Sequence, residues 1–376
     1  EHLHVTPASQ AALKQRAGRA GRTQPGDCYR LLTESSFRML PPARVPDLLR
    51  TDLSPALLQL KVLGVNNLAH FQFLTPPTVD AFAQAMENLY ALEVIDSDGH
   101  LTKTGVQVAE LPLSPVLGRF LILSKEFDCI DEALTICAML SVQTPWFSPG
   151  GSTNTAARLE ACKQSLGVHE GDLVTLLNVY RQFDFYEEDD KEWAKRHMLN
   201  HRVIKRAQQI RGQLIRHLGV NEDDIDACPD VKPLCRAICK AMFMNAAQQR
   251  NDHYVNVRDA SKSHQPTPLY AGDQTIITKK QPEWIVYLTA ERSGDTAYVH
   301  NATAIESDWL MELAPHFYEQ VSAKSLQEKE ERQHAEAAEQ AKKKPKTETA
   351  PVRPMFKKPT RGGGVQRRGV AFGSKR

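Results

Sequence analysis

The chain has 376 residues, enough for two or three domains, and its hydrophobic content of 41% is ordinary for globular protein. No apolar run approaches the roughly 18 residues of a membrane span, so the sequence predicts a soluble intracellular protein with no membrane partner. The net charge of +2 conceals a division: residues 342–376 hold twelve basic residues against one acidic residue, which leaves the rest of the chain acidic.

The first motif along the chain is the octapeptide Gln-Arg-Ala-Gly-Arg-Ala-Gly-Arg at residues 15–22. Its arginines recur every three residues between small residues, which lets several guanidinium groups approach one ligand. Such groups stabilise the charge on a transferred phosphoryl group, and a glutamine such as Gln15 can orient the attacking water or hold a phosphate oxygen. For a bare Arg-x-Gly-Arg, an exposed basic helix start or a clamp on nucleic-acid phosphates is the simpler interpretation.

The full octapeptide resembles the last conserved helicase motif of the DEAH-box family of superfamily 2. Residues 4–9 resemble the incoming strand and turn of that family, and residues 26–34 resemble the strand that follows the motif. The resemblance implies that Gln15, Arg19 and Arg22 are catalytic and contact the phosphates of ATP bound with Mg²⁺, whereas Arg16 has a structural role. A family member also needs a Gly-x-x-x-x-Gly-Lys-Ser/Thr phosphate loop and an acidic Mg²⁺ motif, and the sequence contains neither. We therefore expect the C-terminal portion of a longer enzyme, inactive alone, with its nucleotide site completed by an N-terminal lobe.

Residues 1–43 predict strand, helix and strand, an α/β remnant of the second RecA-like lobe, and Pro41-Pro42 break regular structure. Residues 44–114 predict two amphipathic helices and then a hairpin at residues 94–102, a pattern that indicates a winged helix. The helices are marked by the apolar residues Leu53, Leu57, Leu60 and Leu63, and by Val79, Phe82, Met86, Leu89 and Tyr90. A winged helix can read a nucleic-acid groove or, as the family resemblance implies, brace the motor.

Residues 115–245 are helix-rich, and the family places its helical-bundle (ratchet) domain here. Residues 170–180 resemble the family's Gly-Asp-His-Leu-Thr-Leu-Leu-Asn-Val-Tyr, but Leu173 replaces the usual His and Ala194 a usual Cys, so we assign neither a polar role. Asp172 and Asn178 can contact RNA or cap helices, and capping is the favoured interpretation.

Two other features of this region imitate functional sites. Asp131 and Glu132 imitate the acidic motif, but they open a segment of helical periodicity, where the helix dipole favours acids in the first turn. Cys235 and Cys239 lie one helical turn apart among apolar residues, which predicts buried free thiols rather than metal ligands. We therefore expect no metal site from the chain's own residues.

Residues 246–320 turn to short strands, which suit a small β-barrel, and the resemblance implies an OB-fold that grips single-stranded RNA. Trp284 and Tyr287 can stack on bases, although their alternation favours a core position for at least one of them. Residues 271–274 (Ala271 to Gln274) replace the family's His-Pro-Ser-Ser, and His300 replaces a common Arg, so no RNA contact is carried over to these positions.

Residues 321–376 predict a charged helix and a disordered basic tail, because they contain too few large apolar residues to form a core. The cluster at residues 342–346 resembles a nuclear-localisation patch, or serves as a solubilising or nonspecific RNA-binding tail. The tail can attract phosphates without regard to sequence.

These features predict the C-terminal part of an ATP-dependent RNA helicase that couples hydrolysis to 3′-to-5′ RNA translocation or remodelling of RNA–protein complexes. Pre-mRNA splicing is the favoured process and the nucleus the favoured location, with the cytoplasm second. The expected partners are single-stranded RNA and G-patch or spliceosomal proteins. Alternatives are a non-catalytic RNA-binding or scaffold module, and a DNA helicase or RNA sensor of the same family.

Overall fold

The structure is a computed structural model of the chain. It describes residues 6–147, 153–186, 189–222, 225–262, 266–272, 275–277, 281–294, 296–315 and 317–318. The chain divides into the units Glu1–Leu326 and Gln327–Arg376, and the described residues all belong to the first. The expected charged helix, basic tail and localisation patch lie outside the described residues.

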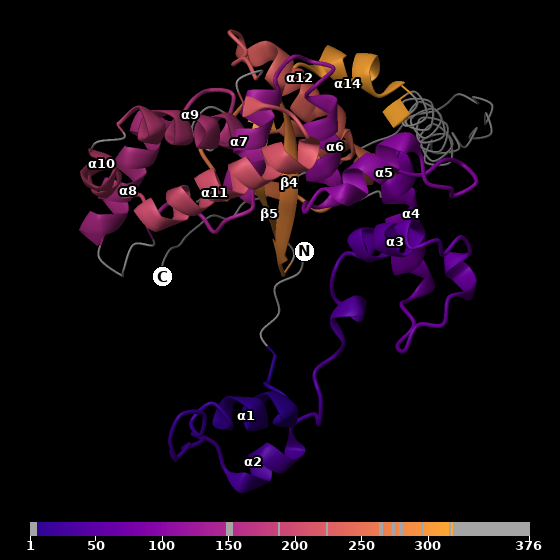
Figure 1. Ribbon diagram of the computed structural model, residues 1–376, viewed down its shortest axis with the longest axis vertical. Coiled ribbons are helices and arrows are strands. Elements are labelled where there is room, and N and C mark those ends of the chain that lie inside the picture. Colours follow the sequence, from indigo (N-terminus) through magenta and orange to yellow (C-terminus); the bar gives the residue numbers. More distant parts are fainter. Residues whose placement is uncertain are drawn as a thin grey trace, which may run out of the picture. The chain divides into compact units, whose positions relative to one another are not determined.

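The N-terminal segment contains two short helices, α1 (Gln10–Ala17) and α2 (Glu34–Met39) (Figure 1). The side chain of Ser9 caps α1 by accepting a hydrogen bond from the backbone N–H of Ala12, at 3.2 Å. The backbone N–H of Gln10 donates to the carbonyl oxygen of Pro41, at 2.9 Å, and so ties the start of α1 to the chain that follows α2. The helix end at Met39 agrees with the predicted break at Pro41-Pro42.

The strand expected at residues 26–34 is absent. Residues 25–30 have no regular structure, and α2 begins at Glu34. Tyr29 is 87% exposed, and no other described segment hydrogen-bonds to this stretch to form a sheet. A β-strand needs a neighbouring backbone to pair with, so a strand-like sequence stays irregular here. Of the other expected strand, residues 6–9 are irregular and residues 4–5 lie outside the described residues.

The next region contains the two helices expected of the winged helix, α3 (Ser54–Val62) and α4 (Val79–Ala91), followed by α5 (Lys103–Glu110). Two single-turn helices, η1 (Asp47–Leu49) and η2 (Leu68–His70), flank α3. Their shared core includes Leu57, Leu89 and Val94. The expected hairpin is reduced to one bridge, Ile95 with Leu101, around a turn in which Gly99 has a φ of +77°.

The apolar stripes of these helices were partly misassigned. Leu63, Val79 and Tyr90 are exposed, and Leu58 is buried instead. Leu63 lies past the last turn of α3 and Val79 is the first residue of α4, so helical periodicity no longer places these side chains on the buried face.

In the described residues of the next stretch, seven α-helices follow (Figure 1). They share one apolar core that includes Phe120, Leu134, Leu173 and Ile204. They are α6 (Pro115–Leu123), α7 (Ile130–Leu140), α8 (Thr153–Leu166), α9 (Asp172–Phe185), α10 (Asp190–Arg196), α11 (His201–Leu218) and α12 (Val231–Met242). The central helix α7 packs against α6, α9 and α11. Cys235 and Cys239 of α12 are buried free thiols, as predicted.

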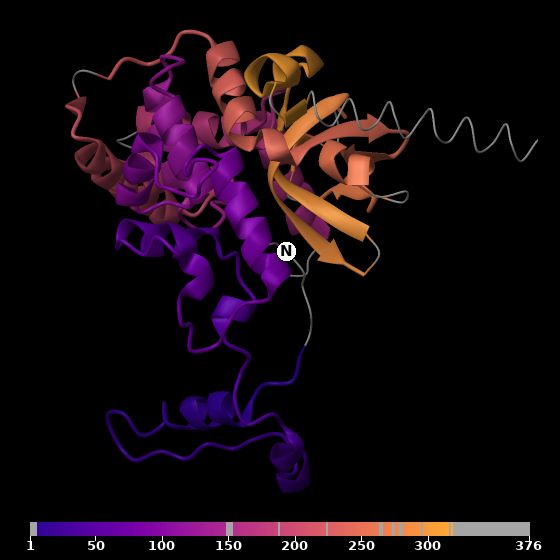
Figure 2. The same cartoon turned by 90° about the vertical axis from the view of Figure 1, so that its right-hand side faces the viewer.

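Five strands then close into a barrel in the order β1-β2-β3-β5-β4. They are β1 (Ala246–Arg250), β2 (His253–Asn256), β3 (Leu269–Ala271), β4 (Trp284–Ser293) and β5 (Thr296–Ala304). All neighbouring pairs are antiparallel except β3 with β5, and Figure 2 shows the long β4–β5 ribbon in orange. The single turn η5 (Phe243–Asn245) leads into β1, α13 (Val257–Lys262) follows β2, and α14 (Ser307–Leu313) follows the barrel and packs against α12.

Among the described residues, no single helix is long and apolar enough to cross a membrane. One pair, α5 and α6, passes such a test together by length and composition, with a bend of 112° between its members.

Candidate nucleic-acid interface

The helical region and the barrel meet where α9 begins. Gly171 forms a bridge with Thr303 of β5, and the carbonyl oxygen of Glu170 accepts a hydrogen bond from the backbone N–H of Ala304 at 2.8 Å. The φ of Gly171 is +112°, and a Cβ at this position would lie 2.4 Å from the carbonyl oxygen of Ala302. Only glycine fits both the backbone angle and the space, so the sequence permits this close approach.

Asp172, the first residue of α9, completes the contact. Its buried carboxylate accepts hydrogen bonds from the hydroxyl of Thr275 at 2.7 Å and from the backbone N–H groups of Ile276 and Ala302, each at 2.8 Å. Burial raises the pKa of this carboxyl group, against the opposing effect of the three donors. The carboxylate makes no capping bond in its own helix, so the favoured capping interpretation was wrong for Asp172.

Asn178, six residues further into α9, behaves as predicted. Its Nδ2 donates to the carbonyl oxygen of Leu166 at 2.7 Å, in the last residue of α8. The amide thereby satisfies a carbonyl group that the end of a helix leaves unpaired. Leu173 and Ala194 are fully buried, in agreement with their lack of a polar role.

A cavity of about 320 Å³ lies beside Asp172. Its lining combines the end of α7, the start of α9 and the barrel: Met139, Leu140, Val142, Thr144, Pro145, Trp146, Asp172, Thr175, Leu176, Ile276, His300 and Asn301. The mixture of aromatic, amide and apolar groups suits an unpaired base or a ribose. His300 lines this cavity although no contact was carried over to it from the family, and its Nε2 lies 3.6 Å from Oε2 of Glu291.

Three aromatic side chains form a row across neighbouring strands of the barrel. The ring centroid of Tyr270 lies 6.0 Å from that of His253 and 6.3 Å from that of Tyr298, which is 40% exposed. The sequence had pointed to Trp284 and Tyr287, with a core position expected for at least one of them. Tyr287 is buried, and its hydroxyl oxygen accepts a hydrogen bond from Asn256 at 2.8 Å.

Trp284 is half-buried and packs against the helical core, so neither residue first considered offers a free stacking face like that of Tyr298. A signal for the row was present in β5, where the buried residues Ala297 and Val299 flank Tyr298. The partner residues could not be identified without the register of β3 against β5.

The predicted nucleotide-contacting residues lie at the end of α1. Gln15 is in its last turn, and Arg19 and Arg22 follow the C-cap Gly18. Their side chains are exposed and make no hydrogen bond or ion pair with any part of the chain that the structure describes. Guanidinium groups without an internal partner are available for an external anion.

Three family models match the chain. They are the winged-helix part of the helicase associated domain (HA2) at residues 85–113, the ratchet-like part of the same domain at residues 114–176, and an oligonucleotide/oligosaccharide-binding (OB) fold at residues 234–318. The two helical matches include α5, α6, α7 and the start of α9, and the third covers the barrel.

Curated relatives extend the comparison beyond these domains. The chain is 39% identical to the human probable ATP-dependent RNA helicase DHX35 over 336 residues, which are 88% of this chain and 46% of that protein. It is 36% identical to the Schizosaccharomyces pombe pre-mRNA-splicing factor ATP-dependent RNA helicase prp22, over 87% of this chain and 27% of that protein. The chain thus spans about half or less of the length of these relatives. It is homologous to the C-terminal part of DEAH-box RNA helicases.

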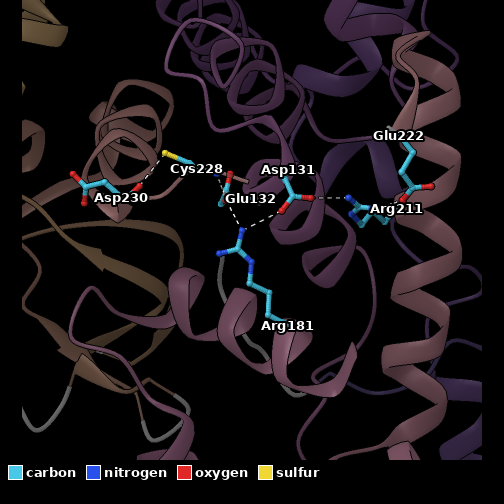
Figure 3. Close-up of polar contacts among 7 residues, drawn as sticks. All are labelled: Asp131, Glu132, Arg181, Arg211, Glu222, Cys228 and Asp230. Atoms are coloured by element: carbon cyan, nitrogen blue, oxygen red, sulfur yellow. Dashed lines mark hydrogen bonds and ion pairs between the residues drawn. The ribbon is translucent and has the colours of Figure 1, made fainter. Parts of the chain in front are cut away.

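In this DEAH-box homologue, Asp131 and Glu132 lie in the first turn of α7, as predicted (Figure 3). Arg181 of α9 pairs with both, at 3.1 Å from Asp131, and Arg211 of α11 lies 2.6 Å from Asp131. The buried Glu132 also accepts a hydrogen bond from the backbone N–H of Cys228 at 2.9 Å. These acids therefore join α7 to α9 and α11.

Proposed function

We propose that this chain is the C-terminal portion of an ATP-dependent RNA helicase and that it holds single-stranded RNA at the junction of its helical and barrel domains. The cavity beside Asp172 carries the proposal, because Trp146 and His300 line it from the two domains that the HA2 and OB-fold models match. An aromatic ring and polar groups in one recess can stack on and orient an unpaired base.

The proposal assigns the nucleotide chemistry to Gln15, Arg19 and Arg22. In a complete site, a phosphate-loop lobe would bind ATP with Mg²⁺, and the arginines would stabilise the charge on the transferred phosphoryl group. The exposure of all three side chains supports this role. ATP-driven closure of two lobes would then pull the held RNA in a 3′-to-5′ sense.

The domain limits that we propose are residues 1–43 for the end of the RecA-like lobe, 44–114 for the winged helix, 115–245 for the ratchet domain, 246–320 for the OB-fold and 321–376 for the tail. A role in pre-mRNA splicing in the nucleus, with spliceosomal or G-patch proteins as partners, is supported by the printed name of the prp22 relative. The DHX35 relative is named as an RNA helicase without a process.

RNA binding by the 376-residue chain tests the proposal. Fluorescence anisotropy with labelled oligouridine should show binding, and Trp146→Ala should weaken it by about 1–3 kcal/mol, the typical value of one stacked base. Tyr90→Ala is the control, because Tyr90 is an exposed aromatic of α4 outside the cavity lining. A matched DNA oligonucleotide measures the preference for RNA. Equal affinity of the unaltered and Trp146→Ala chains would remove the cavity from the RNA site.

A further inference from the structure

The long helix α11 presents a uniformly basic and amide face to solvent. Its exposed side chains are Arg202, Arg206, Gln209, Gln213, Arg216 and His217. None of them is acidic and none is a large apolar residue, and the helix contains no Asp or Glu anywhere. An exposed face of this length ordinarily mixes both signs of charge, so the composition calls for an explanation.

The first five of these residues recur at alternating spacings of four and three, which places them in one stripe along the helix. At a rise of about 1.5 Å per residue, the stripe from Arg202 to Arg216 is about 21 Å long. The stripe is therefore long enough to contact several consecutive groups of an extended polymer.

The described acidic side chains that contact α11 do not neutralise the stripe, because they pair with other side chains of the same helix. They pair off along its flanks: Asp190 lies 3.0 Å from Lys205, Glu222 lies 2.5 Å from Arg211, and Asp184 accepts a hydrogen bond from Gln208. Arg206 has one polar partner within the described residues, the amide oxygen of Gln209 at 3.0 Å. Within the described residues, no acidic side chain pairs with Arg202, Arg206 or Arg216 of the stripe.

The positive charge of Arg202 is not explained by a contribution to folding stability. This residue lies in the first turn of α11, where the helix dipole disfavours positive charge by about 0.3–1 kcal/mol. The first turn contains no acidic residue that would offset this cost. Arg202 makes no side-chain hydrogen bond or ion pair within the described residues, so its side chain contributes little to the fold.

A groove of about 510 Å³ continues the stripe at this end. It is lined by Phe147, Lys191, Lys195, Leu199, Asn200, His201 and Arg202. Phe147 is 46% exposed, and its neighbour Trp146 lines the cavity beside Asp172. Two consecutive residues of one loop thus line the two recesses.

We propose that the groove and the stripe, together the α11 track, bind the phosphodiester backbone of single-stranded RNA that extends from the cavity. This inference rests on the proposed function, because the same RNA occupies the cavity and the α11 track. A basic groove with an exposed aromatic side chain is the usual combination for single strands. An acidic protein is the less suitable occupant, because the stripe has no apolar residue to form the centre of a protein interface.

The test measures the salt dependence of oligouridine binding, with an RNA of about 16 nucleotides and the 376-residue chain. Arg206→Glu with Arg216→Glu removes two phosphate contacts, so the slope of log affinity against log salt should fall in magnitude by about 1.4. Affinity at about 0.1 M salt should fall on the order of tenfold. Lys103→Glu with Lys125→Glu makes the same change in net charge at exposed sites outside the α11 track and should leave the slope unchanged. Arg206→Lys with Arg216→Lys should keep the slope of the unaltered chain.

Equal slopes for the two charge-reversal variants would overturn the α11 track while leaving RNA binding by the chain intact. Absence of oligouridine binding by the unaltered chain would instead contradict the proposed function itself. Binding of an oligoglutamate peptide is measured with the same variants. Loss of peptide binding in Arg206→Glu with Arg216→Glu, with RNA binding unchanged, would assign the face to an acidic protein and overturn the RNA proposal. Circular dichroism melting confirms that each variant is folded.

Discussion

The carboxylate of Asp172 in α9 accepts a hydrogen bond of 2.8 Å from the backbone N–H of Ala302 in β5. Thr275 and Ile276 donate to the same carboxylate, so one side chain of the helical domain satisfies three donors of the barrel. Removing the acceptor leaves these donors buried without a partner, at about 1–3 kcal/mol each.

Asp172→Ala should therefore lower the free energy of unfolding by about 3 kcal/mol or more, measured by urea denaturation. Glu110→Ala, which removes an exposed acid of α5, should change it by less than about 0.5 kcal/mol. A loss no larger than that of the control would show that Asp172 does not join the two domains.

Gly171→Ala should also destabilise the junction, because the new Cβ would approach the carbonyl oxygen of Ala302 to 2.4 Å. Gly219→Ala is the matched control. Gly219 also has a positive φ, of +63°, but its Cβ would meet nothing within 4 Å, so the cost should be limited to about 1–2 kcal/mol of backbone strain. Thermal melting of the two variants separates the effects, and equal losses of Tm would refute the close contact.

The ion pairs of Glu132 predict a structural rather than a catalytic role. Glu132→Ala leaves Arg181 with Asp131 alone and the backbone N–H of Cys228 without its acceptor, so unfolding should become easier by about 3 kcal/mol. In a helicase polypeptide that also carries the phosphate-loop lobe, ATP turnover per folded molecule should stay unchanged. A loss of turnover without loss of stability would contradict a purely structural role for Glu132.

The buried thiols of α12 predict that the folded protein becomes less stable at alkaline pH. Burial raises the pKa of Cys235 and of Cys239 from 9.0 to about 12. The unfolded chain therefore loses these protons at lower pH than the folded chain, and their contribution to stability, full below pH 9.0, is lost as the pH rises toward 12.

The free energy of unfolding should accordingly fall between these two pH values, and Cys235→Ala with Cys239→Ala should reduce the dependence. Iodoacetamide labelling followed by mass spectrometry supplies a second measurement. The exposed Cys28 should react in the folded protein and the two α12 thiols should not. Rapid labelling of either α12 thiol would contradict its burial.

Sequence patterns predicted the elements whose formation depends on residues close together in the chain. The periodicity around Leu57 and Leu89 located α3 and α4, and the short-strand pattern of residues 246–320 located the barrel. Properties set by distant backbone were not predictable in this way. The strand expected at residues 26–34 has no neighbouring strand in the described residues, and strand formation depends on such a neighbour.

In the candidate site, too, residues of a local motif were predictable, whereas residues brought together by the fold were not. The octapeptide at residues 15–22 identified the arginines from local sequence alone. The donors to Asp172 are Thr275, Ile276 and Ala302, more than 100 residues away, so no spacing rule points to them. The row of Tyr270 and Tyr298 depends on a parallel pairing of β3 with β5 that alternation within each strand cannot reveal.

We propose that Arg19 acts on bound nucleotide while other parts of the chain hold RNA. The decisive measurement is RNA-stimulated ATP hydrolysis by the complete helicase polypeptide. Arg19→Ala should reduce turnover by about 10³-fold or more, with the Kd for RNA unchanged. Lys14→Ala removes an exposed cation of the preceding helix α1 and should leave both quantities unaltered. Near-normal turnover of Arg19→Ala would contradict the claim.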